Sequence, residues 1–412
     1  MSNENRVKNI DTPIHDWYRF ILSFPPHLVR EYINIFSIDE SDIVLDPFCG
    51  TGTTNVECKK HGISSIGIEA NPITHFASLT KCNWDAAISS MLHDAQLIAN
   101  QARIAIHKSN NLKKLTEDQN KLILKNSICD RPLSETIILR DTILSTHSQF
   151  ENYFLLALAK NIVYSYSNLK FGPEVGICRK KIYHIDVVSI WLQQVSVMQN
   201  DLYQVAALKN TSTSIIKGDS RLIKNMQLTK KINFVITSPP YPNEKDYSRT
   251  TRLESVLLGF INNKDQLRTI KKQLIRSNTK NVYKGDADFQ YISNITSILK
   301  LSRDIENKRI ELNKTSGFEK LYSTVVKLYF GGMARHLQEL KYVLKKDAKL
   351  AYVVGDQASY FKIHIRTAEL LAEVAESIGY KVLGINNFRK RYATATNTWL
   401  NEDVLILKYI GG

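Results

Sequence analysis

The segment Thr237-Ser238-Pro239-Pro240-Tyr241 directly follows a mostly apolar run from Ile232 to Ile236. Proline fixes φ and has no N–H, so the two prolines present only carbonyl oxygens, while Ser238 adds a hydroxyl and Tyr241 adds a flat ring. These groups suit a planar heterocycle whose exocyclic amine points at the oxygens and whose ring lies on Tyr241. A strand followed by a proline turn is the alternative interpretation. Residues 238–241 are called the Ser-Pro-Pro-Tyr motif below.

A second group of residues, Asp46-Pro47-Phe48-Cys49-Gly50-Thr51-Gly52-Thr53, leaves another apolar run and enters an expected helix. Gly50 and Gly52 allow a tight turn and a close approach of the backbone to a ligand, toward which the helix would direct its N–H groups. Glu69 lies 19 residues after Gly50, where an acidic residue can accept hydrogen bonds from both hydroxyls of a ribose. Asp219 follows a further apolar run and could accept an adenine amino group.

Asp46, Glu69 and Asp219 all stand at expected carboxyl ends of strands, where open α/β sheets bind their ligands. The ligand would be an adenosine with a cationic or zwitterionic tail, because Asp46 would repel a pyrophosphate. Each residue also has another explanation: Asp46 as a helix cap, Glu69 as a surface charge and Asp219 as a turn residue. The three together favour a nucleoside site.

The elements that position these residues are predicted from short β-branched runs and from helical periodicity between them. Leu321–Leu344 and Thr367–Ile378 are expected helices, the first kinked or split at Gly331-Gly332. Alternating strands and helices predict an α/β fold with a doubly wound, mostly parallel, seven-stranded Rossmann-like sheet and an antiparallel last strand. The expected strands are Ile43–Leu45, Ser65–Ile68, Thr213–Ile216, Ile232–Ile236, Leu350–Val354, Tyr380–Ile385 and Asp403–Leu407.

Two stretches, residues 85–210 and residues 261–316, do not follow this alternation and are expected to be largely helical insertions. The core domain would then be assembled from residues 1–84 with the glycine-rich loop, residues 211–260 with the Ser-Pro-Pro-Tyr motif, and residues 317–412. Insertions of this kind commonly carry the recognition loops of a scaffold.

The composition indicates a basic protein with a polyanionic partner. The 412 residues carry a formal net charge of +15 and a pI near 9.4, for which nucleic acid is the first candidate. The five cysteines are widely spaced and form no Cys-x-x-Cys pair, which argues against a disulfide framework or a metal site and fits a reducing cytoplasm. We find no signal peptide and no apolar stretch long enough to span a bilayer, and therefore expect a cytoplasmic protein without a membrane partner.

The glycine-rich loop and the Ser-Pro-Pro-Tyr motif together resemble those of the S-adenosylmethionine-dependent DNA amino-methyltransferases. The serine form resembles the branch that methylates N4 of cytosine, whereas adenine enzymes more often have Asp or Asn at this position. The likeness extends to Phe24-Pro25-Pro26-His27-Leu28, Val354-Gly355-Asp356 and residues 401–405, and leaves the two insertions outside it. It implies a class I methyltransferase fold.

The resemblance also implies S-adenosyl-L-methionine as the cofactor and assigns roles to individual residues. A cytosine would rotate out of the duplex and stack on Tyr241, while Ser238 and the Pro239 carbonyl accept hydrogen bonds from its amine, which aims the nitrogen at the methyl group. No metal is implied. The catalytic residues would be Ser238, Pro239, Pro240 and Tyr241. The cofactor-binding residues would be Asp46, Phe48, Gly50, Gly52, Thr53, Glu69 and Asp219.

Positively charged residues recur about every fourth position after the fourth expected strand, and a further group precedes the last strand. We interpret them as phosphate contacts, although a solvated charged face is the alternative. Which insertion reads the target sequence stays open. The expected DNA-binding residues are Lys264, Arg268, Lys271, Lys272, Arg276, Arg389 and Arg391.

The sequence therefore predicts a site-specific methyltransferase acting on cytosine N4 in double-stranded DNA, within a restriction–modification or related defence system that includes a companion restriction endonuclease. An adenine-N6 DNA methyltransferase is the main alternative. An RNA guanine-N2 methyltransferase shares the glycine-rich loop and a Pro-Pro-Tyr, but the early start of the loop at Asp46 leaves no room for an N-terminal RNA-binding domain. A non-enzymatic DNA-binding protein would not require Asp46, Glu69, Asp219 and Ser238 together.

Overall fold

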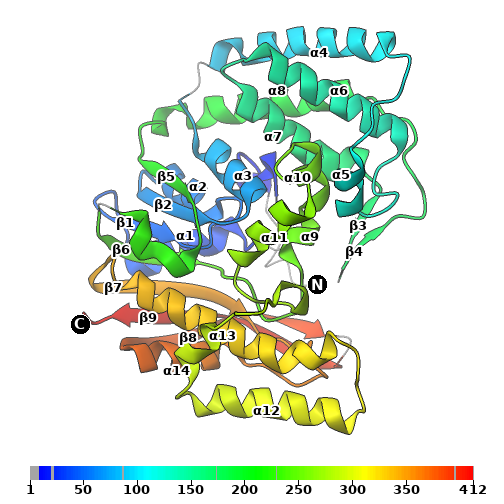
Figure 1. Ribbon diagram of the computed structural model, residues 1–412. Helices are drawn as coiled ribbons and strands as arrows, with labels where there is room; N and C mark the ends of the chain where they lie inside the picture. The colour runs from blue at the N-terminus through cyan, green and yellow to red at the C-terminus, as the bar shows by residue number, and fades with distance from the viewer. Residues whose placement is uncertain are drawn as a thin grey trace.

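The centre of the protein is a seven-stranded sheet with the order β5-β2-β1-β6-β7-β9-β8 (Figure 1). The computed structural model describes residues 9–19, 23–85, 88–172, 174–228, 230–393 and 396–411. The strands of this sheet are β1 (Ile43–Asp46), β2 (Ser64–Glu69), β5 (Thr213–Lys217), β6 (Ile232–Thr237), β7 (Leu344–Gly355), β8 (Tyr380–Ala393) and β9 (Thr398–Tyr409). Every strand expected from the sequence is present, and each is longer than expected.

The pairing confirms a doubly wound, mostly parallel sheet. Strand β1 pairs in parallel with β2 on one side and with β6 on the other, and the sheet extends in parallel to β5 and to β7. The last strand, β9, lies between β7 and β8 and runs antiparallel to both. Because the chain winds outward in both directions from β1, the neighbouring carboxyl ends of β1 and β6 form a crevice suited to a ligand.

Alternating side chains on β7 divide the core between the two faces of the sheet. Ala351 and Val353 pack in one cluster with the apolar side of α1 (Pro26–Phe36). Leu350, Tyr352 and Val354 pack in another cluster with α13 (Tyr322–Leu340) and α14 (Thr367–Ile378). The remaining helices of the parallel half are α2 (Thr53–Lys60) and α3 (Pro72–Cys82).

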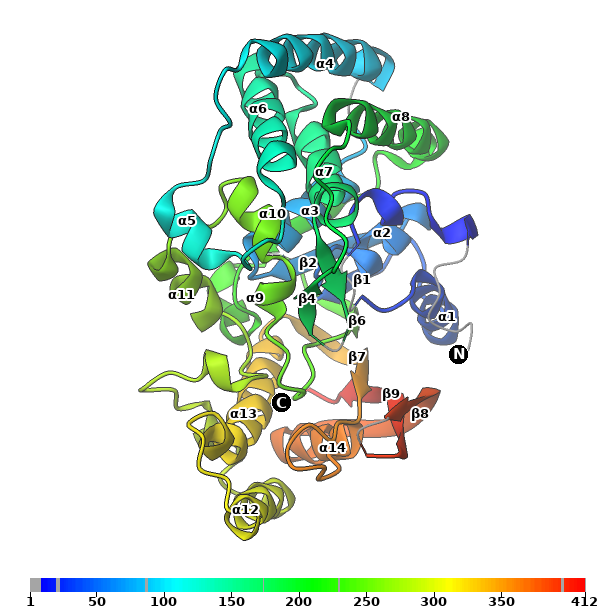
Figure 2. The same cartoon turned by 90° about the vertical axis from the view of Figure 1, so that its right-hand side faces the viewer.

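The first predicted insertion forms a layer of helices that packs against α3, shown at the top of Figure 2. Residues Trp191 and Met198 of this layer share one continuous apolar core with Phe76 and Ala77 of α3. A short antiparallel hairpin, β3 (Leu169–Phe171) and β4 (Val175–Ile177), leaves the layer. The helices are α4 (Met91–Lys108), α5 (Glu117–Leu122), α6 (Asp130–Thr146), α7 (Glu151–Asn161) and α8 (Val187–Val205).

The second predicted insertion is also largely helical and connects β6 to α13. Contrary to the expected kink, α13 runs without interruption through Gly331 and Gly332. A Cβ on Gly331 would lie 2.1 Å from the carbonyl oxygen of Asp288, so this glycine permits a close approach of the inserted chain. The helices after β6 are α9 (Tyr247–Thr250), α10 (Arg252–Leu257), α11 (Lys264–Lys272) and α12 (Thr296–Glu311). Within the described residues, no helix has the length and apolar character needed to cross a bilayer.

Candidate active site

A cavity of about 880 Å³ lies at the carboxyl ends of the central strands. Its walls come from the loops after β1, β2, β5 and β6, from the end of β8, and from hairpin β3–β4 of the first insertion. The glycine-rich loop and the Ser-Pro-Pro-Tyr motif are 190 residues apart in sequence, as judged from Phe48 and Ser238, yet both line this cavity. The switch in winding direction between β1 and β6 brings them together.

The glycine-rich loop adopts a conformation that requires its two glycines. Gly50 has φ of 52° and Gly52 has φ of 83°, both in the left-handed region that side chains with a Cβ disfavour. A Cβ on Gly52 would also lie 3.0 Å from the Cβ of Ser78 on α3. The loop can therefore pass close to α3 and present Thr53, the first residue of α2, to the cavity.

Glu69 fixes this loop from the end of β2. Its Oε2 accepts a hydrogen bond from the Gly50 N–H at 2.8 Å, and its Oε1 accepts one from the Asn71 N–H at 2.7 Å. Each carboxylate oxygen keeps a further lone pair for a donor in the cavity. Burial raises the pKa of Glu69 to about 7.

Asp46 links the two motifs but lies behind the cavity wall. Its Oδ1 accepts hydrogen bonds from the Thr237 hydroxyl at 2.6 Å and from the Phe48 N–H at 3.1 Å. The side chain is fully buried, and its Oδ2 has no hydrogen-bond partner among the described residues. Burial raises the pKa of Asp46 to about 6. Asp46 thus ties the end of β1 to the residue that precedes Ser238.

Asp219, the third carboxylate expected to meet the cofactor, does not line the cavity, although its neighbours Gly218 and Ser220 do. Its two oxygens accept hydrogen bonds from the backbone and guanidinium of Arg221, with a closest approach of 2.7 Å. Arg221 also pairs with Asp288 at 2.7 Å. The structure therefore directs Asp219 into a buried ion pair, and the sequence showed no signal for this arrangement beyond an arginine two positions later.

His336 of α13 supports the same wall and was missed by sequence reasoning. Its Nδ1–H donates to the Ser220 carbonyl at 3.0 Å, its Nε2 accepts from the Tyr352 hydroxyl at 2.7 Å, and its ring packs edge-on against Phe48 at 4.8 Å. Burial lowers the pKa of His336 to about 4, so the imidazole is neutral, as these bonds require. His336 thereby fixes two cavity-lining groups, Phe48 and Ser220.

The Ser-Pro-Pro-Tyr motif forms the opposite wall. The Ser238 hydroxyl donates to the Val353 carbonyl at 3.1 Å, and its oxygen lies 3.4 Å from the Tyr241 hydroxyl. Because this bond uses the hydroxyl hydrogen of Ser238, Tyr241 is the donor in the second contact, and one lone pair of Ser238 Oγ remains available to an amine. The Tyr241 N–H donates to the Tyr247 hydroxyl at 3.0 Å, which holds the turn after Pro240 in place.

The ring of Tyr241 packs closely against the end of β7. A Cβ on Gly355 would lie 3.0 Å from Cε2 of this ring, so a glycine is needed at that position. Burial and the nearby carboxylate of Glu402 raise the pKa of Tyr241, which keeps its phenol neutral. The motif therefore presents one aromatic ring and one hydroxyl oxygen to the cavity, without a negative charge.

Comparisons with known proteins agree with this geometry. Residues 2–76 match the model of the N6/N4 DNA methylase family. The Type II methyltransferase M.BsoBI from Geobacillus stearothermophilus is 25% identical over 93% of this chain and 82% of its own length. M.AvaI from Nostoc sp. is 25% identical over 91% and 80%. This chain is therefore similar to the N6/N4 DNA methylases in residues 2–76, and to Type II methyltransferases over most of its length.

Among solved structures, the rRNA methyltransferase aviRa from Streptomyces viridochromogenes aligns over 97% of this chain and 94% of its own, with 9% identity and a TM-score of 0.34. This similarity is too low to support any comparison of function. The assignment of the class I fold therefore rests on the strand order and pairing of this chain itself.

The cofactor of this protein is S-adenosylmethionine, and the cavity wall fits it. Glu69 offers acceptors for the ribose hydroxyls, Thr53 begins a helix whose N–H groups face the cavity, and Phe48 provides an apolar surface. Of the predicted cofactor residues, Phe48, Gly50, Thr53 and Glu69 line the cavity, whereas Asp46, Gly52 and Asp219 lie behind it.

The pKa of Glu69 predicts how cofactor binding depends on pH. With a pKa of about 7, Glu69 is largely protonated below neutrality in the free protein, and binding to hydroxyl donors favours its ionised form. We therefore expect the affinity for S-adenosylmethionine to fall by about tenfold between pH 8 and pH 6. Calorimetric titration at both values measures this change. Glu69→Gln should bind more weakly at pH 8 with a flatter pH dependence, and an unchanged slope in this variant would contradict the assignment.

The predicted DNA-binding residues divide into those that are exposed or line the cavity and those that are buried. Lys264, Arg268 and Lys272 are exposed on α11, and Arg389 and Arg391 line the cavity, where Arg389 pairs with Glu402 and Arg391 donates to the Asp356 carbonyl.

Lys271 and Arg276, by contrast, are buried. Lys271 pairs with Asp246 at 2.8 Å. Arg276 pairs with both oxygens of Asp286 and donates to backbone carbonyls. The prediction that all of these cations contact DNA is therefore corrected for Lys271 and Arg276. Their side chains stabilise the fold through these pairs and are not available to phosphate.

Proposed function

We propose that this protein methylates N4 of cytosine at a specific site in double-stranded DNA. The observation that carries the proposal is the uncharged Ser-Pro-Pro-Tyr motif, in which Ser238 Oγ is anchored to Val353 and keeps one lone pair for an amine. A cytosine amine can donate to this oxygen and to the Pro239 carbonyl while its ring stacks on Tyr241. These contacts orient the nitrogen, and S-adenosylmethionine, when bound against Glu69, supplies the methyl group.

The role of the protein in this reaction is mainly positioning. Ser238 and Pro239 would fix the direction of the amine, and Tyr241 would hold the ring of the extruded base. The cost of extruding a base is about a few kcal/mol, which stacking on one aromatic ring repays in part. No covalent bond between protein and base is needed, because the amine itself attacks the methyl group.

We further propose that the protein is the modification enzyme of a restriction–modification system with a companion endonuclease. The proposal is supported by the names of its relatives, which are Type II methyltransferases matched over most of their length. The exposed cations of α11, namely Lys264, Arg268 and Lys272, and the cavity-lining Arg389 and Arg391 would contact the phosphates of the substrate.

Expression in a host without DNA methylation, followed by sequencing that detects modified bases, tests the proposal. We expect N4-methylcytosine within one short motif in DNA from cells with the wild-type chain and none in cells with Ser238→Ala or an empty vector. N6-methyladenine in place of N4-methylcytosine would overturn the choice of base and leave the DNA methyltransferase activity in place. DNA without any modified base would overturn both.

A further inference from the structure

The hairpin β3–β4 reaches the cavity from the first insertion, far in sequence from the other lining segments. In both views it points from the helical layer toward the level of the central sheet (Figures 1 and 2). Phe171, Gly172, Glu174 and Val175 line the cavity. Glu174 forms an ion pair with Arg249 of α9 at 3.2 Å, so the hairpin is tied to the helix that follows the Ser-Pro-Pro-Tyr motif.

The two faces of the hairpin differ in what covers them. Leu169 and Phe171 share one face and pack against the apolar core of the insertion. Lys170 points to the other face, where its cross-strand partner is Gly176. Among the described residues, no atom would lie within 4 Å of a Cβ on Gly176, and Gly176 is not among the glycines with positive φ. Neither the packing nor the backbone conformation of this strand therefore requires a glycine.

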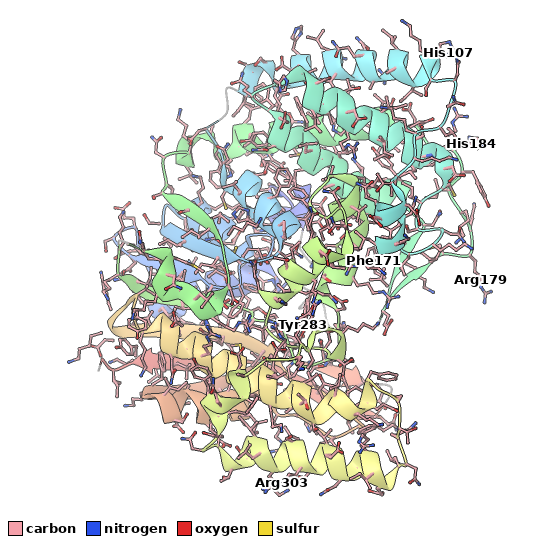
Figure 3. The ribbon with its side chains drawn as sticks, viewed as in Figure 1. His107, Phe171, Arg179, His184, Tyr283 and Arg303 are labelled. Atoms are coloured by element: carbon pink, nitrogen blue, oxygen red, sulfur yellow. The ribbon has the colours of Figure 1, made fainter. Side chains whose placement is uncertain are left out.

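The hairpin and the residues that directly follow it are strongly basic. From Asn168 to Lys181 the only acidic residue is Glu174, which is already paired with Arg249. Lys170, Arg179 and Lys180 are exposed, and none of them forms an ion pair within the described part of the chain. Figure 3 shows Phe171 and Arg179 at mid-height on the right of the view, and Arg303 on α12 at the bottom. Exposed cations beside a strand glycine form a surface that a phosphate backbone can approach closely.

We infer that the open face of hairpin β3–β4 docks on duplex DNA beside the target base. Gly176 lets the sugar-phosphate backbone approach the strand, and Lys170, Arg179 and Lys180 contact phosphates. Phe171, on the other face, closes the cavity around the extruded base. This inference rests on the proposed DNA substrate, but it does not depend on whether the base is cytosine or adenine.

The variant Gly176→Thr separates docking from folding. Threonine favours strands, so the variant should be at least as thermally stable as the wild type, and its affinity for S-adenosylmethionine should be unchanged. We expect it to bind a duplex with the methylated motif at least about tenfold more weakly, because its side chain occupies the docking face. Gly384→Thr on β8 is the matched control, since Gly384 also has open space around it, and it should bind like the wild type.

The charge on the hairpin is tested by the salt dependence of duplex binding. The triple variant Lys170→Ala, Arg179→Ala, Lys180→Ala should reduce the slope of log affinity against log salt by about 2 to 3, since each lost phosphate contact removes roughly 0.9. Arg303→Ala removes an exposed charge on α12 and should leave the slope unchanged.

The inference would be overturned if the Gly176 variant and the triple variant both bound duplex DNA with the affinity and the salt dependence of the wild type. So would weakened binding of duplex RNA with unchanged binding of DNA. Modified adenine in the genomic DNA would overturn only the choice of base, because the hairpin variants report on docking whichever base is methylated.

Discussion

Replacement of Tyr241 by alanine is expected to slow methyl transfer by about 10- to 100-fold, because stacking of a base on one aromatic side chain contributes roughly 1–3 kcal/mol. The ring lies beside Ser238 and against Gly355, so its loss removes the surface on which the extruded base would rest. The cofactor wall around Glu69 is built from other strands, and the affinity for S-adenosylmethionine should therefore remain within about twofold of the wild type.

Single-turnover transfer of a labelled methyl group to a duplex with the target motif measures this effect. Tyr241→Phe is the matched variant, because it keeps the ring and removes only the hydroxyl near Ser238. We expect this variant to retain most of the wild-type rate. An equal loss in both variants would assign the effect to the hydroxyl, and an unchanged rate in Tyr241→Ala would remove the stacking role altogether.

The strands and the two motifs could be predicted because their signals are local. Each strand is a short β-branched run followed by turn or polar residues, and the motifs begin where β1 and β6 end. Parallel strands place their carboxyl ends at one edge of the sheet, so Phe48 and Ser238 were expected to meet there, and both line the cavity.

Other parts of the site depend on contacts that the sequence does not reveal. Phe171 reaches the cavity only because the first insertion packs on α3 and directs its hairpin toward the sheet. His336 contacts Ser220, which lies 116 residues away in sequence. Asp219 was expected to bind the cofactor, with a turn residue as the alternative, but the preference of its carboxylate for Arg221 over a ligand depends on the arginine being buried beside it.

The Gly331-Gly332 pair of α13 is another feature whose role depends on a contact that the sequence does not reveal. A Gly-Gly pair within a helix predicts a bend from helix propensity alone. In α13 the pair is instead explained by the backbone at Asp288, which approaches Gly331 too closely for a side chain. Helix propensity describes an isolated helix, whereas the packing of the inserted chain against α13 explains why a glycine stands at position 331.

The spacing of charged residues predicts that they share a surface, but it does not predict which of them form ion pairs with acidic residues elsewhere in the fold. Lys271 pairs with Asp246, 25 residues before it, and Arg276 pairs with Asp286, 10 residues after it. The side chains of Arg268 and Lys272, on the same helix as Lys271, stay exposed beside the ring of Tyr283. Arg268 and Arg276 therefore have the same charge and belong to the same regular spacing but have different roles, and this difference can be measured.

Arg276→Ala is expected to destabilise the protein by about 3–5 kcal/mol, because it leaves the partly buried carboxylate of Asp286 and several backbone carbonyls without their donor. The segment that this arginine holds includes Leu274, Thr279 and Lys280, which line the cavity. Arg268→Ala removes an exposed charge from α11 and should leave stability within about 0.5 kcal/mol of the wild type. Thermal and urea unfolding of both variants measure the difference.

The salt dependence of DNA binding should be affected by the Arg268 substitution and not by the Arg276 substitution, which is the reverse of their effects on stability. Arg268→Ala is expected to reduce the slope of log affinity against log salt by about 0.9, the value for one lost phosphate contact. Arg276→Gln removes the charge and the paired hydrogen bonds to Asp286, so it should lose stability without a change in the salt slope at temperatures where it is folded. A lower slope in folded Arg276→Gln would mean that Arg276 leaves Asp286 to bind phosphate. An unchanged slope would mean that the buried pair persists in the DNA complex, and that the fourth-residue spacing of cations reflects two separate demands, one from the fold and one from the substrate.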